Sequence, residues 1–191
     1  MVFRSEREKR LWLAAGLCLV LIYSSLSVAR PAAEFLRERN LLRLAVALAF
    51  LSAGGLVLWR LLSTRVNWRV LGTVGAIGVG YLGLLMTIPM MPEERLHFLE
   101  YGVVAALIYL ALQERRVRFA AATTDANDLL VRLPPFVTAV FVTGLVGWID
   151  EGIQALLPNR YYDIRDVAFN AAAALFCLVS VKLVEWARRH E

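Results

Sequence analysis

Residues 133–157 read LPPFVTAVFVTGLVGWIDEGIQALL, and this stretch contains the two features that decide the fold. No charged residue occurs from Leu133 to Ile149, and the run is close to the roughly 20 apolar residues that a helix needs to cross a bilayer core. The run then meets two adjacent carboxylates, Asp150 and Glu151. The stretch therefore predicts a membrane-spanning helix with ionisable groups near one end.

The composition of the whole chain also indicates a membrane protein. Of the 191 residues, 59% are hydrophobic and 19% are charged, whereas soluble domains are roughly 45–50% apolar and about 25% charged. The 21 basic side chains exceed the 16 acidic ones, but they stand between apolar runs, where they set membrane topology, so we expect no nucleic-acid partner. The two cysteines, Cys18 and Cys177, lie inside apolar runs and are expected to be packing thiols, and no cofactor is predicted.

Apolar runs of spanning length occur six times in the chain. They predict an all-α, polytopic membrane protein, a single membrane domain over residues 1–191, with six transmembrane helices at residues 11–28, 41–59, 70–91, 97–112, 133–157 and 167–186. The fourth run is the shortest, and the polar segment that follows it, Gln113 to Arg132, is predicted to be a solvated loop. The first run also resembles a secretory signal, but its length favours an uncleaved helix.

Lysine and arginine residues predict the orientation of the helices, because basic loops are retained in the cytoplasm. Fourteen of them lie near the helix ends that share a side with the N-terminus, and seven lie on the other side. Both termini are therefore predicted to be cytoplasmic. The connections after the third and fifth helices are predicted to lie outside.

Polar side chains gather in three clusters near predicted helix ends, and ionisable groups close to hydrocarbon are candidates for function. Each cluster lies 19 residues from a cytoplasmic arginine, about 28 Å along a helix, so all three are expected to meet at the outer interface. The predicted site comprises His97, Glu100, Tyr101, Asp150, Glu151, Gln154, Arg160, Asp163, Asp166 and Asn170.

Simpler roles exist for part of this set. Asp163 and Asp166 have the spacing of a helix cap and its partner, and Arg165 could pair with Asp163 for stability. Asp150 and Glu151 are harder to explain in this way, because adjacent carboxylates near a helix C-terminus repel each other and the helix dipole. A compensating cation is expected: Arg160, a protonated His97, a metal ion or a positively charged ligand group. No metal site is predicted from the spacing.

The clusters resemble those of the VanZ-like family of small bacterial membrane proteins. The resemblance is carried by three motifs, His97-Phe98-Leu99-Glu100-Tyr101-Gly102, Asp150-Glu151-Gly152-Ile153-Gln154 with Pro158 and Arg160, and Asp163 with Asp166 and Asn170. It covers residues 89–177, and residues 41–91 look like two extra helices. Asn159 and Ala173 stand where the family often has glycine. The family's namesake is associated with teicoplanin resistance, which implies a role in the bacterial cell envelope and a location in the bacterial inner membrane.

Three functions are compatible with these residues. The first is an envelope protein whose outer-face pocket binds a lipid head group, a cell-wall precursor or a glycopeptide. The second is a membrane-embedded enzyme that uses the histidine and carboxylates for acid–base or metal-assisted chemistry, although the chain has no H-E-x-x-H, G-x-S-x-G or P-loop motif. The third is a structural subunit of a larger membrane-protein complex, in which the polar clusters lock helices together.

Overall fold

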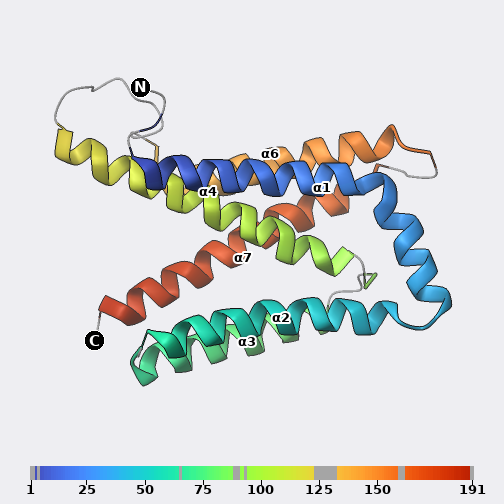
Figure 1. Cartoon of the computed structure of the whole chain (residues 1–191), viewed down its shortest axis with the longest axis horizontal. Helices are drawn as coiled ribbons and strands as arrows, with labels where there is room; N and C mark the ends of the chain where they lie inside the picture. Colours follow the sequence, from blue (N-terminus) through green and yellow to red (C-terminus); the bar gives the residue numbers. More distant parts are fainter. Residues whose placement is uncertain are drawn as a thin grey trace.

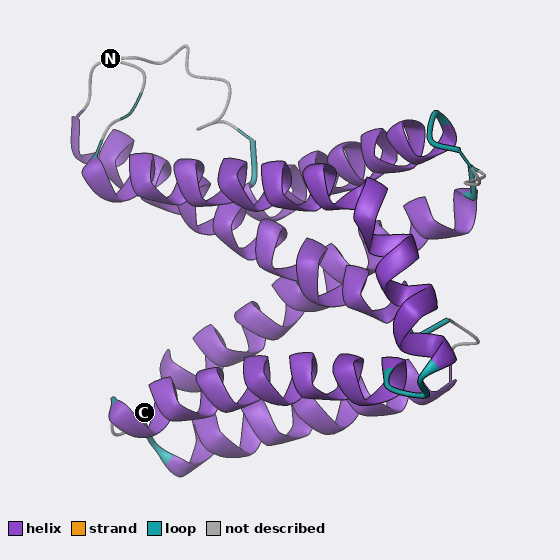
Figure 2. Ribbon diagram, turned by 45° about the vertical axis from the view of Figure 1, so that its right-hand side comes forward, coloured by secondary structure: helices purple, strands orange, loops and turns teal. Residues whose placement is uncertain are grey.

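The computed structural model describes residues 3, 5–64, 66–87, 91–92, 94–122, 133–158 and 162–189. Within this part of the chain the regular structure is helical, as Figure 2 shows. Six helices are long and apolar enough to span a membrane, so the predicted all-α fold with six spans is confirmed. They are α1 (Glu6–Glu38), α2 (Leu42–Ser63), α3 (Trp68–Thr87), α4 (Glu94–Ala122), α6 (Pro135–Ala155) and α7 (Ile164–Arg189).

The helices form two groups of different character. Helices α1, α4, α6 and α7 pack together, and we call them the four-helix bundle. Helices α2 and α3 form a hairpin at the side of this bundle, where α3 packs on α7 (Figure 1). Helix α1 begins and α7 ends at the same end of the molecule, as an even number of crossings requires (Figure 1). We call the opposite end, where α4 and α7 begin and α6 ends, the polar end.

Helix α1 is longer than the predicted span, because it continues beyond Val28 to Glu38. Pro31 lies inside it and has no N–H to donate to the preceding turn, and α1 bends in its C-terminal part (Figure 1). The chain then turns at Asn40, whose φ of 58° lies in the left-handed region that asparagine tolerates. The bent end of α1 thus leads the chain away from the four-helix bundle and into the hairpin.

The prediction that the fourth span is the shortest is wrong. Helix α4 has 29 residues, so residues 113–122 are helical and do not form the predicted solvated loop. The extension is stabilised by charges, since Arg118 pairs with Glu114 one turn earlier and Arg115 Nη1 lies 2.8 Å from Glu8 Oε1 on α1. A prediction from hydropathy ends the span at the first charged residues. The helix itself continues, because its charged side chains have partners of opposite charge. The rest of the predicted loop, residues 123–132, lies outside the described residues.

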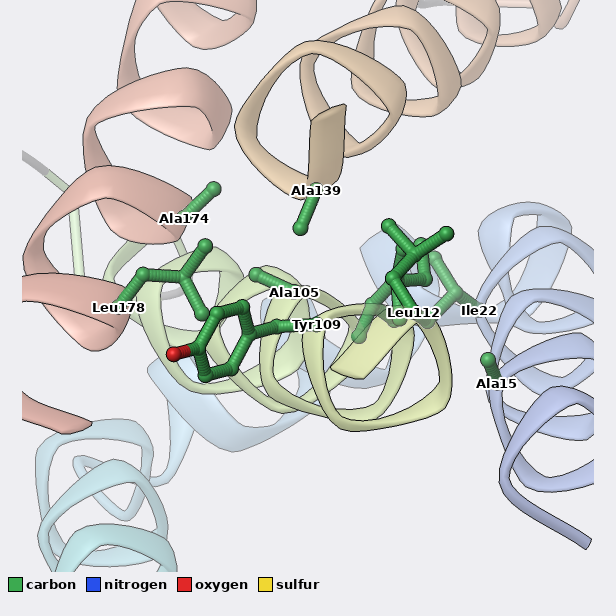
Figure 3. Close-up of a cluster of buried hydrophobic side chains, with 10 residues drawn as sticks. Ala15, Ile22, Ala105, Tyr109, Leu112, Ala139, Ala174 and Leu178 are labelled. Carbon is green, nitrogen blue, oxygen red and sulfur yellow. The ribbon is translucent and has the colours of Figure 1, made fainter. Parts of the chain in front are cut away.

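Small and large apolar side chains alternate in the core of the four-helix bundle. Figure 3 shows alanines of all four helices around larger residues such as Tyr109 and Leu178. Small side chains let membrane helices approach closely, and α6 and α7 are the extreme case. A Cβ on Gly147 would lie 2.7 Å from Cβ of Asn170, so only glycine permits this approach. This contact holds the polar segments of α6 and α7 side by side.

Candidate functional site

The polar end gathers side chains from three helices and the segment before α7. Helix α4 brings His97, Glu100 and Tyr101 within its first turns, because their spacing of three and four residues places them on one face. Helices α6 and α7 bring the other side chains, which are Asp150, Glu151, Gln154, Asp166 and Asn170. Asp163 directly precedes α7. We call these nine residues the polar cluster.

The α6 carboxylates are the most deeply buried charged groups of the cluster. Asp150 has no exposed surface and Glu151 has 1%. Gln154 Nε2 donates to Asp150 Oδ2 at 3.3 Å and to Glu151 Oε1 at 3.0 Å. The backbone N–H of Asp163 donates to Glu151 Oε2 at 3.2 Å. Glu151 therefore ties the end of α6 to the start of α7.

His97 connects this buried part to the end of the bundle. Its Nδ1 lies 3.5 Å from Glu100 Oε2, an ion-pair distance without hydrogen-bond geometry. The charges of Asp150 and Asp166 also act on the imidazole. The side chains of His97 and Glu100 are 18% and 38% exposed, whereas Tyr101 is fully buried. The α4 face thus runs from the surface into the interior.

The α7 residues divide into a buried and an exposed part. Asn170 is fully buried, and its Nδ2 lies 3.5 Å from the Gly147 carbonyl oxygen. Asp163 lies at the cap position that its spacing to Asp166 suggested, because α7 begins at the next residue, Ile164. Its Oδ1 accepts from the Arg165 backbone N–H at 2.8 Å, and the Arg165 guanidinium pairs with this carboxylate and lowers its pKa.

Several polar atoms of the cluster lack a partner, although their surroundings are closed. They are His97 Nδ1, the Tyr101 hydroxyl, Asp150 Oδ1 and Asn170 Oδ1, and the last three belong to residues with no exposed surface. Tyr101 faces Asp150, but the two groups do not reach hydrogen-bond geometry. Buried polar atoms normally have partners, and an unpaired one costs about 1–3 kcal/mol. A set of such atoms in one place is typical of a site that takes up another group.

Tyr23 of α1 belongs to the same environment and was not among the predicted site residues. Its hydroxyl donates to the Val146 carbonyl oxygen on α6 at 2.7 Å, and the Asp150 charge acts on it. A tyrosine within an otherwise apolar span was the available signal. Arg95 was also missed: its Nε is buried without a hydrogen-bond partner at the start of α4.

Arg160, the predicted cation of the site, lies outside the described residues. Within the residues that are described, no three histidine, cysteine or acidic side chains are placed to hold a metal ion together. The described side chains there supply hydrogen-bond donors and acceptors, carboxylates and one imidazole.

The six apolar helices define the class of this chain as a multi-pass helical membrane protein. Comparisons with protein-family models, curated proteins and solved structures found no match to it.

Proposed function

We propose that this protein is a bacterial cell-envelope membrane protein whose polar cluster binds a polar ligand at the outer face of the cytoplasmic membrane. The ligand is a lipid head group, a cell-wall precursor or a glycopeptide. The observation that carries the proposal is the burial of Asp150 and Glu151, at 0% and 1% exposure, with Asp150 Oδ1 unpaired. Buried charge inside a membrane bundle is costly, and it marks binding or transport sites when it is not paired.

A buried charge elsewhere in the chain supports this interpretation by contrast. Glu8, near the other end of the bundle, is also fully buried, but Arg115 Nη1 lies 2.8 Å from its carboxylate. That pair joins α1 to α4 and serves the fold. Asp150 has an amide donor on one oxygen and none on the other. The polar cluster thus differs from a charge pair that only holds helices together.

The outer location rests on the basic residues, which predict cytoplasmic termini and so place the polar end outside. We also propose that the chain is a distant VanZ-like protein, with residues 89–177 as the common core and residues 41–91 as an addition. The support is that the described residues of the three motifs lie at one end of three packed helices, α4, α6 and α7, in the order that the resemblance implies. Envelope lipids and a larger membrane complex are the partners this proposal allows.

A second candidate function is acid–base catalysis at the same place. It is favoured by the surroundings of His97. The charges of Asp150 and Asp166 act on its imidazole, and its ring lies beside that of Tyr101, with centroids 6.0 Å apart. A histidine and a carboxylate in one site can exchange protons with a bound group. Lipid profiling of a deletion strain separates the candidates, because only an enzyme changes the chemical structure of an envelope lipid or glycan.

The binding proposal is tested by identifying what the protein retains. The full chain is purified in native lipid discs, and the retained polar molecules are identified by mass spectrometry. Glu151→Gln and His97→Gln are expected to lose a molecule that the wild type enriches over the surrounding membrane. Glu185→Gln, on α7 near the other end of the bundle, is the matched control and is expected to keep it. Equal retention in all four proteins would refute the proposal.

A further inference from the structure

Among the fully buried groups of the polar cluster, acceptors without a partner outnumber donors without one. Asp150 Oδ1 and Asn170 Oδ1 are both buried and unpaired, and an amide or ionised carboxylate oxygen can only accept. The orientation of the Asn170 amide follows from its surroundings, because its nitrogen faces the carbonyl oxygen of Gly147, which is itself an acceptor. The Tyr101 hydroxyl, also buried and unpaired, can accept as well. A complementary group must therefore bring N–H or O–H donors.

The charge of the cluster is also one-sided. The carboxylates of Glu100, Asp150 and Asp166 all act on His97, and Glu151 experiences the charges of Asp150 and Asp166. Each of these four carboxylates interacts electrostatically with the imidazole of His97. Such a cluster is stabilised by a cation or by protonation of carboxylates, because uncompensated buried charge destabilises a membrane bundle.

Arg165, a basic side chain beside the cluster, is already engaged. Arg165 holds the carboxylate of Asp163 through both its guanidinium and its backbone N–H. Its side chain is 74% exposed, so it lies at the rim and not among the buried carboxylates.

We propose that the polar cluster binds the primary ammonium group of its ligand, as carried by an ethanolamine head group or by the free amino group of an envelope peptide. This inference rests on the proposed function, because it names the ligand chemistry of the same site. A primary ammonium brings one positive charge and three N–H donors. The charge complements the carboxylates, and the donors match the free oxygens of Asp150, Asn170 and Tyr101.

The same features predict which head groups are rejected. A trimethylammonium group carries the charge but has no N–H donor, so the buried acceptors would stay unpaired. It is also bulkier, and Asp150, Asn170 and Tyr101 have no exposed surface. A phosphatidylglycerol head group has hydroxyl donors but no positive charge. Ethanolamine lipid should therefore bind best, and binding should weaken with each N-methyl group.

The test measures the thermal stability of the full chain in detergent against the concentration of short-chain lipids, from which Kd is obtained. The probes are dihexanoyl phosphatidylethanolamine, its mono-, di- and trimethylated forms, dihexanoyl phosphatidylglycerol, and a dialanine peptide as a soluble primary amine. Kd is expected to be about tenfold lower for the ethanolamine lipid than for the trimethylated form, the scale of a charge-assisted hydrogen bond.

Single-residue variants test whether the ethanolamine lipid binds at the polar cluster. Asp150→Asn is expected to raise Kd for the ethanolamine lipid about tenfold, and Tyr101→Phe a few-fold. Tyr109→Phe is the matched control: this tyrosine lies two turns further along α4, where Gln113 donates to its hydroxyl and Glu185 accepts from it, and Kd should not change. If Asp150→Asn does not fold, the methylation series in the wild type decides the question.

Each outcome separates this inference from the proposed function. Tight binding of dialanine but not of the ethanolamine lipid supports the ammonium site and assigns the ligand to a soluble amine. Equal binding of the trimethylated lipid or of phosphatidylglycerol, lost in Asp150→Asn, overturns the ammonium inference while head-group binding stands. No stabilisation by any probe overturns the ammonium inference, and the retention experiment above still tests the proposed function independently.

Discussion

The four-helix bundle and the α2–α3 hairpin have similar hydropathy but differ in what they bury. In the most apolar 18-residue window of α4 half of the residues are buried, against 11% in α2 and in α3. Within the described residues, the buried polar side chains, tyrosines included, belong to α1, α4, α6 or α7 of the bundle. The hairpin can rest in lipid on its own apolar surface, whereas the bundle creates an interior in which polar groups can be held. Function is therefore expected from the bundle.

The largest difference between the two regions is expected for buried charge. Arg115→Met removes the partner of the fully buried Glu8 and should lower the free energy of unfolding by about 3–5 kcal/mol, because a buried charge is left uncompensated. Arg60→Met, at an exposed position of α2, should change it by less than about 0.5 kcal/mol. Reversible unfolding in mixed micelles measures both. Similar values for the two variants would remove the distinction.

The next-largest difference in unfolding free energy is expected when a mutation leaves a cavity. Leu178→Ala in α7 empties a position with no exposed surface in the main core and should cost about 2–4 kcal/mol. Leu82→Ala in α3, at a position 57% exposed, removes lipid contacts only and should cost less than about 1 kcal/mol. The same unfolding assay applies. A larger loss for Leu82→Ala would show that this face of the hairpin is covered by protein.

A third comparison adds one methyl group to a glycine of the four-helix bundle and to a glycine of the hairpin. Gly147→Ala places Cβ 2.7 Å from Cβ of Asn170 and should destabilise the bundle by about 1–3 kcal/mol, because α6 and α7 must move apart. Gly78→Ala in α3 meets nothing within 4 Å and should be neutral or stabilising by up to about 1 kcal/mol. Both replace a glycine within a helix, so the difference reports the contact alone. Equal stability would contradict the close approach of α6 and α7.

The smallest effect concerns the exposed rim of the polar end. Arg165 lowers the pKa of Asp163, so the pair stabilises the folded state above the ordinary aspartate pKa of about 3.9, and this contribution is lost as the pH falls through the lowered value. Arg165→Met should return the pKa of Asp163 towards about 3.9, measured by carbon NMR of the carboxyl group. High salt should weaken the shift in the wild type. An unchanged pKa in Arg165→Met would exclude the pairing.

The sequence predicted that these polar residues lie near one another, but it predicted few of the contacts among them. Counting residues from the arginines predicted to be cytoplasmic placed His97, Glu151 and Asn170 at one depth, and they lie at one end of the bundle, because helical rise per residue is nearly constant. Tyr23 and its bond to Val146 could not be found in this way, since 123 residues separate the partners. The Asp163–Arg165 pair was foreseen as one option, because it is local.

The number of spans, the helical class and the grouping of polar residues near particular helix ends were determined by the sequence alone, because transfer of a side chain into lipid depends on that side chain and not on its neighbours. Tertiary structure decided that α1 bends and continues to Glu38, that α4 reaches Ala122, and that the hairpin stays outside the bundle. It also decided which carboxylates are buried and which are paired. These properties depend on contacts between distant segments, which hydropathy does not measure.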